Sequence, residues 1–350
     1  MSLPGSGGRL RVSDTGERAL IERIRARLPA APPELVVGIG DDAAVAAPDR
    51  GALQVLTTDA LVEGVHFDRR FSAPADIGYK ALAVNVSDVA SMGGTPRFAL
   101  LSLMLPPDTL VADVDGLLDG LVELASTSAI TLAGGNLTRS PGPLILDVTL
   151  VGSVKPRKIL KRNGAKAGDA LYVTGQLGGA TAGLEWLRAA SGAAPIAGQV
   201  ARPDDAGLAS CVARHCRPEP RARIGALLGR NRAASACMDL SDGLADGVAQ
   251  ITGASGVGAA IDPALLPLHP GARAWFTAAG RDPVGACVAG GDDYELLFTV
   301  PRRARGRLRA VIREARGVPV TRIGEITAGR TIGLLREGTL EPLPEGFVHF

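Results

Sequence analysis

The chain has 350 residues, of which 46% are hydrophobic, a size and composition that favour two domains with buried cores. Its 38 Lys and Arg residues nearly balance 36 Asp and Glu residues, which argues against nucleic acid as a partner. There is no membrane-length apolar run and no signal-peptide pattern, and four cysteines are too few for a disulfide framework, so we expect a soluble, cytoplasmic protein.

The first 13 residues are rich in Gly and Ser and are expected to be disordered. Apolar residues at helical spacing from Asp14 to Leu28 predict a helix, which the following prolines end. Val36 to Asp42 then places two carboxylates beside glycines. This arrangement either lets the backbone approach a ligand or forms a simple Gly-Asp turn.

A strand is predicted from Leu53 to Thr57, ending at Thr58 and Asp59. Oxygen ligands at the end of a strand suit a hard cation. His66 follows shortly afterwards, where it would either contact a substrate phosphate or cap a loop.

A helix from about Pro74 to Gly94 is the element around which we expect the site to be built. It is apolar almost all round, except that Asn85, Asp88 and Ser91 recur every three residues and so share one stripe. An ionised Asp on a buried helix is costly unless a cation or donor meets it, so Asp88 is expected to face a lined cavity. The alternative is that Asp88 bonds only to neighbouring backbone.

The rest of the first domain is predicted as a strand from Phe98 to Leu105, a helix from Pro107 to Ser126, a strand from Ile130 to Ala133, a turn at Gly134 to Asn136, and a strand from Leu144 to Val154. This β-α-β-α-β-β order predicts an α/β domain over residues 14–154, with helices on one face of a mixed sheet. The strand from Phe98 is continuously apolar, which indicates burial on both faces. With two helices available, the second face would be buried by another copy of the chain or by the C-terminal domain.

Residues 155–350 are predicted as a C-terminal α/β sandwich. It opens with the only dense basic run, Lys155 to Lys166, which is either a solvated linker or a segment over a phosphate site. The expected strands are 170–174, 296–300 and 319–323, and the expected helices are 180–190, 222–228, 244–251 and 303–316. The aromatic tail from Gly346 to Phe350 is expected to be docked.

Two acidic clusters mark this second domain. Asp239 and Asp242 precede a helix, and Asp242 is a natural N-cap, but capping does not explain an acid three residues earlier. Gly290 to Glu295 joins paired glycines to three acids before a strand. Asp239 and Asp242, three residues apart, can hold one or two ions.

The chain thus offers hard oxygen ligands without supporting His or Cys, an inventory that suits Mg²⁺ held by carboxylates and substrate phosphates. Cys211, His215 and Cys216 lack a fourth partner at metal-binding spacing, which argues against zinc. There is no Walker A sequence, no kinase catalytic loop and no Gly-x-Gly-x-x-Gly after a strand, so another phosphate-binding fold is expected.

Taken in order over about residues 14–350, these motifs resemble the thiamine-monophosphate kinase family, in the superfamily of aminoimidazole ribonucleotide synthetase. The resemblance is carried by Gly38 to Asp42, Thr57 to Asp59, Gly64 to Phe67, Lys80 to Gly94, Asp239 to Gly243, Gly290-Gly291 with Asp293 to Glu295, and His349-Phe350. It implies an N-terminal domain that forms a homodimer through a barrel-like interface, a C-terminal domain over it, and ATP with several Mg²⁺ ions.

The resemblance also implies roles for individual residues. The magnesium ligands would be Asp42, Thr57, Thr58, Asp59, Asp88, Asp239 and Asp242, with Asp42, Asp88, Asp239 and Asp242 as the catalytic acids. ATP would contact Gly135, Asn136, Arg162 and Ser241, and thiamine monophosphate would contact His66, Asp292 and Phe347.

Three of these positions depart from the family pattern. Asn136 stands where many members have Asp, which removes one ligand charge. Asp292 replaces a more usual Glu and reaches one methylene less far. Phe347 stands where Tyr or Trp is common, so it keeps a stacking face and loses the polar group.

The expected reaction is direct in-line transfer of the γ-phosphoryl group of ATP to thiamine monophosphate, giving thiamine diphosphate and ADP. The two substrates bring roughly five or six negative charges together, so cations must neutralise them. The acceptor is already an oxyanion and needs little help from a general base, which leaves positioning and electrostatic stabilisation. The alternatives are a superfamily enzyme that uses ATP to activate an amide or carbonyl oxygen for ring closure, and a nucleotide-binding dimeric scaffold without turnover.

Overall fold

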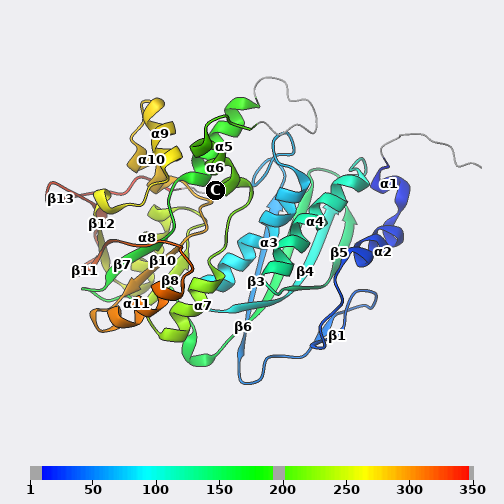
Figure 1. Cartoon of the computed structure of the whole chain (residues 1–350), viewed down its shortest axis with the longest axis horizontal. Coiled ribbons are helices and arrows are strands. Elements are labelled where there is room, and N and C mark those ends of the chain that lie inside the picture. The colour runs from blue at the N-terminus through cyan, green and yellow to red at the C-terminus, as the bar shows by residue number, and fades with distance from the viewer. Residues whose placement is uncertain (1–9, 192–201, 347–350) are drawn as a thin grey trace, which may run out of the picture.

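A four-stranded mixed sheet forms the base of the N-terminal domain in the computed structural model, which describes residues 10–191 and 202–346 (Figure 1). The strand order is β3-β6-β4-β5, in which β6 is antiparallel to β3 and β4, and β4 is parallel to β5. The strands are β3 (Leu53–Val62), β4 (Thr95–Leu105), β5 (Thr131–Arg139) and β6 (Ile145–Val154). The predicted mixed sheet and its β-α-β-α-β-β order are confirmed.

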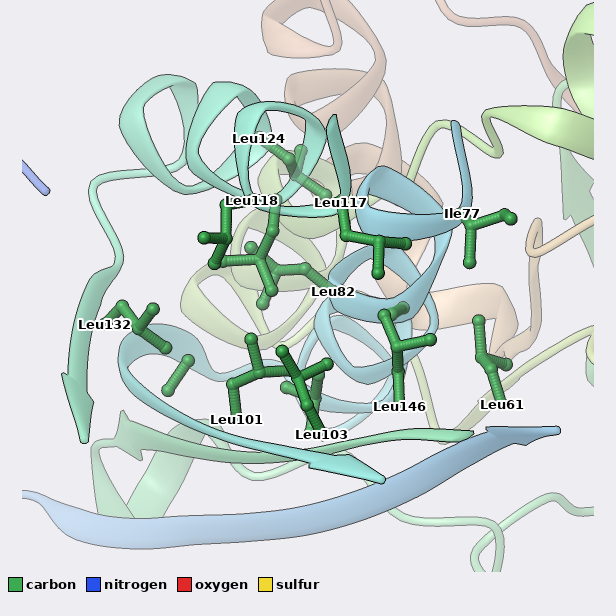
Figure 2. Close-up of a cluster of buried hydrophobic side chains, with 14 of the residues drawn as sticks. Leu61, Ile77, Leu82, Leu101, Leu103, Leu117, Leu118, Leu124, Leu132 and Leu146 are labelled. Atoms are coloured by element: carbon green, nitrogen blue, oxygen red, sulfur yellow. The ribbon is translucent and has the colours of Figure 1, made fainter. Parts of the chain in front are cut away.

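One face of this sheet is covered by α3 (Pro74–Ser91) and α4 (Val111–Thr127). Figure 2 shows their leucines meeting those of the strands, with Leu82 of α3 and Leu118 of α4 above Leu101 and Leu103 of β4. Leu82, Leu118 and Leu146 have no exposed surface. Each such side chain contributes about 1.5–3 kcal/mol by burial, so this apolar layer fixes the position of α3.

The opposite face of the sheet is open within one chain. Alternate residues point to it, and Leu56 and Leu100 are 67% and 37% exposed. The expectation that the strand from Phe98 is buried on both faces is therefore wrong for the single chain, because both helices pack on the same side.

Two predictions about strands in this domain were wrong. β3 does not end at Thr57 but continues to Val62, so Thr57, Thr58 and Asp59 lie inside a strand that pairs with β6 throughout. The predicted turn at Gly134 to Asn136 is part of β5, because these residues pair in parallel with β4.

The N-terminal segment packs at the far end of this domain. It comprises α1 (Val12–Thr15), α2 (Glu17–Arg27) and the small hairpin of β1 (Leu35–Val37) and β2 (Val45–Ala46). Disorder was expected over residues 1–13; residues 1–9 lie outside the described part, and for residues 10–13 the expectation is wrong. Val12 is buried, and its N–H donates to Thr109 O at 2.9 Å.

The C-terminal domain is built on a sheet with the order β13-β12-β9-β11-β7-β10-β8. Its strands are β7 (Ala170–Thr174), β8 (Ala236–Asp239), β9 (Gly258–Ile261), β10 (Leu296–Val300), β11 (Val320–Thr327), β12 (Ile332–Arg336) and β13 (Thr339–Glu341). Its helices are α5 (Gly179–Ala190), α6 (Ala206–Cys216), α7 (Ala222–Asn231), α8 (Leu244–Ser255), α9 (Pro270–Ala278), α10 (Pro283–Ala289) and α11 (Arg305–Glu314). Short 3-10 turns occur at η1 (Pro156–Lys158), η2 (Pro263–Leu265) and η3 (Arg302–Ala304).

Helices cover both faces of this sheet, which confirms the predicted sandwich. Leu297 of β10 faces a core shared with α8 and α9, whereas its neighbour Phe298 faces a core shared with α7 and α11. The strands β8, β9, β12 and β13 and the helices α6, α9 and α10 are not among the predicted elements. Each of these four strands has five residues or fewer, which is too short for a clear period-two pattern. In the described residues, no helix has the length and apolar character needed to cross a membrane.

The two domains meet where α7 crosses α3. Gly225 of α7 lies so close to α3 that a Cβ at this position would be 2.0 Å from Ala90 O. A larger residue would push the helices apart, and with them the domains.

We expect Gly225→Ala to lower the free energy of unfolding by about 1–3 kcal/mol, because the added methyl group has no space. Gly253→Ala is the matched control, since a Cβ at this α8 position would meet nothing within 4 Å and Ala favours a helix by about 0.5–1 kcal/mol. Urea unfolding should show that Gly225→Ala is less stable than the parent chain and that Gly253→Ala is at least as stable as the parent. Equal stability of the two variants would contradict the close crossing.

Candidate active site

A pocket of about 520 Å³ opens between the two domains. Strand β3 and helix α3 line it from the N-terminal domain, and the end of β8, helix α5 and the loop before β10 line it from the C-terminal domain. Among the predicted site residues, those that line it are Asp59, His66, Asp88, Asp239, Ser241, Asp242 and Asp292. The structure thus gathers acids that the sequence separates by more than 200 positions.

Three of these carboxylates crowd one another. Burial, followed by the charges of Asp88 and Asp239, raises the pKa of Asp59 to about 7. Burial and the charge of Asp88 raise the pKa of Asp239 to about 6, even though Ser87 Oγ donates to it at 2.7 Å. None of the three forms an ion pair with Lys or Arg in the residues described, so the cluster has the electrostatics of a cation site.

Strand and helix geometry explains which side chains reach this cluster. Thr57 and Asp59 are two residues apart on β3, so both point towards α3, and Thr57 Oγ1 donates to Asp88 Oδ2. In the predicted stripe of α3, Asp88 alone lines the pocket. Asn85 Nδ2 donates to Ala81 O, and Ser91 Oγ donates to Asp88 O. Both side chains therefore donate to backbone carbonyl oxygens of α3 itself and not to a group in the pocket.

A buried lysine fixes the other side of the pocket. Lys80 of α3 has a 4% exposed side chain, and its Nζ lies 2.8 Å from Asp292 Oδ2 across the domain boundary. Although burial by itself raises the pKa of Asp292, the charge of Lys80 holds that pKa well below its usual range. His215 Nδ1 lies 3.5 Å from the same carboxylate oxygen, and burial lowers the pKa of this imidazole.

The three acids before β10 have different tasks. Asp292 faces the pocket, whereas Asp293 accepts from the N–H groups of Gly178 and Ala180. Glu295 has no exposed surface and accepts twice from the guanidinium of Arg221. The latter two acids therefore hold the loop, in which Asp292 and Tyr294 adopt φ values of 67° and 49°.

Comparisons with known proteins identify the family of the chain. Family models for the N-terminal and C-terminal domains of AIR synthase related protein match residues 40–154 and 166–336. The thiamine-monophosphate kinase of Escherichia coli strain K12 is 39% identical over 340 residues, covering 96% of this chain and 98% of that protein. The chain belongs to the thiamine-monophosphate kinase family.

Solved structures of this family have the same fold. The thiamine-monophosphate kinase of Stenotrophomonas maltophilia K279a superposes with a TM-score of 0.80 at 36% identity, covering 92% of this chain and 96% of that one. AaThiL in complex with AMPPCP and TMP superposes with a TM-score of 0.74 at 31% identity, covering 98% of this chain and 100% of that one.

Several residues to which the family resemblance gave a role are not among the described residues that line the pocket. Thr58 points to the open face of the sheet, where its hydroxyl donates to Asp147 Oδ1 at 2.9 Å. Asp42 is exposed in the loop between β1 and β2. Arg162 bonds to Gln250 of α8, and Phe347 lies outside the described residues.

Gly135 and Asn136 lie on the opposite edge strand from Asp59. Asn136 pairs with Ser102, Ser102 with Asp147, and Asp147 with Ala60. This row crosses three strand spacings, or roughly 14 Å. In one chain, Asn136 therefore cannot join a metal ion held at Asp59.

Several residues in or beside the pocket have no role predicted from the sequence, among them Lys80, Ser87, His215 and Tyr294. Lys80 carried a usable signal, because a lysine on a helix that is otherwise apolar has to meet a buried anion. Asp242 was considered as an N-cap, but Gly243 occupies the N-cap position of α8, and Asp242 lines the pocket. All four cysteines are buried and free.

Proposed function

We propose that this chain transfers the γ-phosphoryl group of ATP to thiamine monophosphate, giving thiamine diphosphate and ADP. The proposal is carried by one observation: the crowded carboxylates Asp59, Asp88 and Asp239 line a pocket formed by both domains. It is supported by the names of the relatives, since AaThiL binds AMPPCP and TMP. The reaction is expected in the cytoplasm, where thiols such as the four free cysteines stay reduced.

The donor set fits Mg²⁺. The described residues contain no group of three His, Cys, Asp or Glu side chains that could hold a metal ion by themselves. Magnesium normally keeps several waters and takes only one or two carboxylates together with substrate phosphates, so a complete protein cage is not required. Asp59, Asp88, Asp239 and Asp242, with the Thr57 hydroxyl, would hold the ions, which when bound neutralise the phosphate oxygens.

Two further lining residues, His66 and Asp292, would orient the acceptor. His66 Nδ1 accepts from Val62 N at 3.1 Å, which leaves the proton of the neutral ring on Nε2, the nitrogen suited to donate to a phosphate oxygen. Asp292, anchored by Lys80, supplies a fixed anion beside the thiamine, which carries a positively charged thiazolium ring. Because the acceptor phosphate is already an oxyanion, these residues act by position and charge.

The product assay tests this function. Purified chain incubated with ATP, Mg²⁺ and thiamine monophosphate should release thiamine diphosphate and ADP in equal amounts, as measured by chromatography. If ATP is consumed only when an amide-bearing nucleotide is supplied, the ring-closing alternative replaces the kinase. Binding of ATP without any turnover would favour the scaffold.

We further propose that the enzyme is a homodimer in which a second copy completes each site. The open sheet face exposes Leu56 and Leu100, and Asn136 lies on the same face. Asp42 lies in the segment after β1, and a Cβ on nearby Gly38 would come within 3.9 Å of Ala133 O of β5. Pairing of two sheets would bring these far-edge residues of one copy towards the β3 edge of the other.

Leu56→Asp with Leu100→Asp should convert the dimer to a monomer in sedimentation velocity, because charges would replace the apolar interface. Leu265→Asp is the matched control, since Leu265 is 46% exposed on the C-terminal domain. Mixing inactive Asp42→Asn and Asp88→Asn chains should restore part of the activity, because one site of the heterodimer is then intact. A monomeric parent chain, or no restored activity, contradicts the shared site.

A further inference from the structure

A second pocket, of about 480 Å³, lies where the N-terminal sheet, the linker and α7 meet. It shares no lining residue with the pocket between the domains that Asp59, Asp88 and Asp239 line, which we call the acidic pocket. Among the described residues that line it, the charged ones are mostly cationic: they are Arg50, Arg97, Lys155, Lys158 and Arg230, with Asp49 as the one acid. The basic run that begins at Lys155 therefore contributes its first lysines here and not over the acidic pocket.

Most of this positive charge is not neutralised. Arg97 pairs with Asp49 at 2.6 Å, and Arg230 pairs with Glu314 at 2.5 Å. Lys155 Nζ donates to Arg50 O at 2.6 Å, a contact that leaves its charge in place. Arg50 and Lys158 form no ion pair within the described residues. Three cations thus face one pocket in a chain whose net charge is only +2.

The backbone that carries Lys158 is held by both domains. A Cβ would lie 2.9 Å from Lys158 O if added at Gly93, at the end of α3, and 2.4 Å from it if added at Gly229 of α7. In the turn η1, Lys158 N donates to Lys155 O at 2.8 Å, which fixes the spacing of the two lysines. Leu160 N then donates to Met92 O at 3.0 Å. Lys155 and Lys158 are therefore presented by a packed turn and not by a free linker.

We propose that this pocket is a second binding site, for the diphosphate group of a small metabolite taken up without a divalent metal. Lysine ammonium groups act as point charges for phosphate, and Arg50 adds a planar fork of donors. The cations converge on a concave pocket and do not form a stripe along the surface, which favours a small anion over a nucleic acid. The occupant would contact Arg50 and Arg97 of the first domain and Arg230 of the second.

Removal of metal separates this site from the acidic pocket. In EDTA the crowded carboxylates Asp59, Asp88 and Asp239 of the interdomain pocket repel a diphosphate, because none of them is paired with Lys or Arg in the described residues, whereas the basic pocket needs no metal. Isothermal titration of the full chain with pyrophosphate in EDTA should therefore show saturable binding at one site per chain. ADP and thiamine diphosphate, titrated in the same way, identify which molecule supplies the group.

Arg50→Gln with Lys158→Gln should weaken pyrophosphate binding at least tenfold, with the thermal unfolding temperature in EDTA unchanged. Arg305→Gln with Arg309→Gln is the matched control, because it removes the same charge from exposed positions of α11 outside the pocket. Binding that persists in the first variant, that falls equally in both, or that requires Mg²⁺ would overturn the proposal. The product assay on the same variants is separate, and loss of pyrophosphate binding with intact turnover is the expected pattern.

Discussion

Asp88→Asn should lower kcat/KM for phosphoryl transfer by about 100- to 1000-fold, the loss expected when one preorganised electrostatic contact is removed from an active site. The amide keeps the shape of the side chain, and the Thr57 hydroxyl can still donate to its oxygen. What is lost is the charge that we propose holds Mg²⁺ between the domains. Steady-state kinetics over a range of Mg²⁺ concentrations would measure the effect.

The same variant should not destabilise the metal-free chain. Asp88 raises the pKa of both Asp59 and Asp239, so removal of its charge relieves repulsion in the cluster. The unfolding temperature in EDTA should stay level or rise. Asp108→Asn, at an exposed position outside the pocket, is the matched control and should change neither quantity. Near-normal activity of Asp88→Asn at limiting Mg²⁺ would mean that α3 does not carry the metal site.

Lys80→Met should lower the free energy of unfolding by about 3 kcal/mol, because it leaves Asp292 without its cation. The figure is at the low end for a buried pair, since a third of the Asp292 side chain is exposed and water screens it. The loop that presents Asp292 should also loosen, so KM for thiamine monophosphate should rise. Urea unfolding and steady-state kinetics give the two readouts.

A double-mutant cycle tests whether Lys80 acts through Asp292. Lys80→Met with Asp292→Asn should lose less stability than the sum of the single variants, because the second change removes the charge that the first leaves unpaired. Lys161→Met, at an exposed linker position, should be neutral. Additive losses would show that Lys80 stabilises the chain without this contact.

The parts of the site that could be predicted are those with local causes. Asp88 is predictable as a site residue because an ionised acid on a buried apolar helix is costly unless a cation or donor meets it. Asp239 is predictable because helix capping by Asp242 does not explain a second acid three residues earlier. Lys80 and Asp292 lie 212 residues apart, and no local pattern links them. Asp292 and Asp293 have different roles because the backbone of Asp292 adopts a positive φ of 67°, and sequence patterns do not predict this conformation for an Asp.

The errors in strand boundaries also have physical causes. Thr58 is predicted to act beside Asp59 because the strand is expected to end at these two residues and the family resemblance makes both of them metal ligands. Once the strand continues, period-two alternation sends its hydroxyl to the opposite face. Gly134 and Gly135 indicated a turn, yet parallel pairing with β4 keeps them extended. Tertiary pairing outweighed local propensity at this position.

The strand order of the C-terminal sheet affects how the chain can fold during synthesis. β7 is translated first but pairs only with β10 and β11, and its Thr174 bonds to Glu295, 121 residues later. At ribosomal rates of roughly 5 to 20 residues per second, β7 waits roughly 6 to 24 s for its neighbour. The strands of the N-terminal sheet pair with no later segment, so Asp59 and Asp88 are in place while β8, which ends at Asp239, still lacks its partner strand β10. Nascent chains should therefore pass through a stage in which one half of the catalytic centre is folded and the other half is exposed to chaperones.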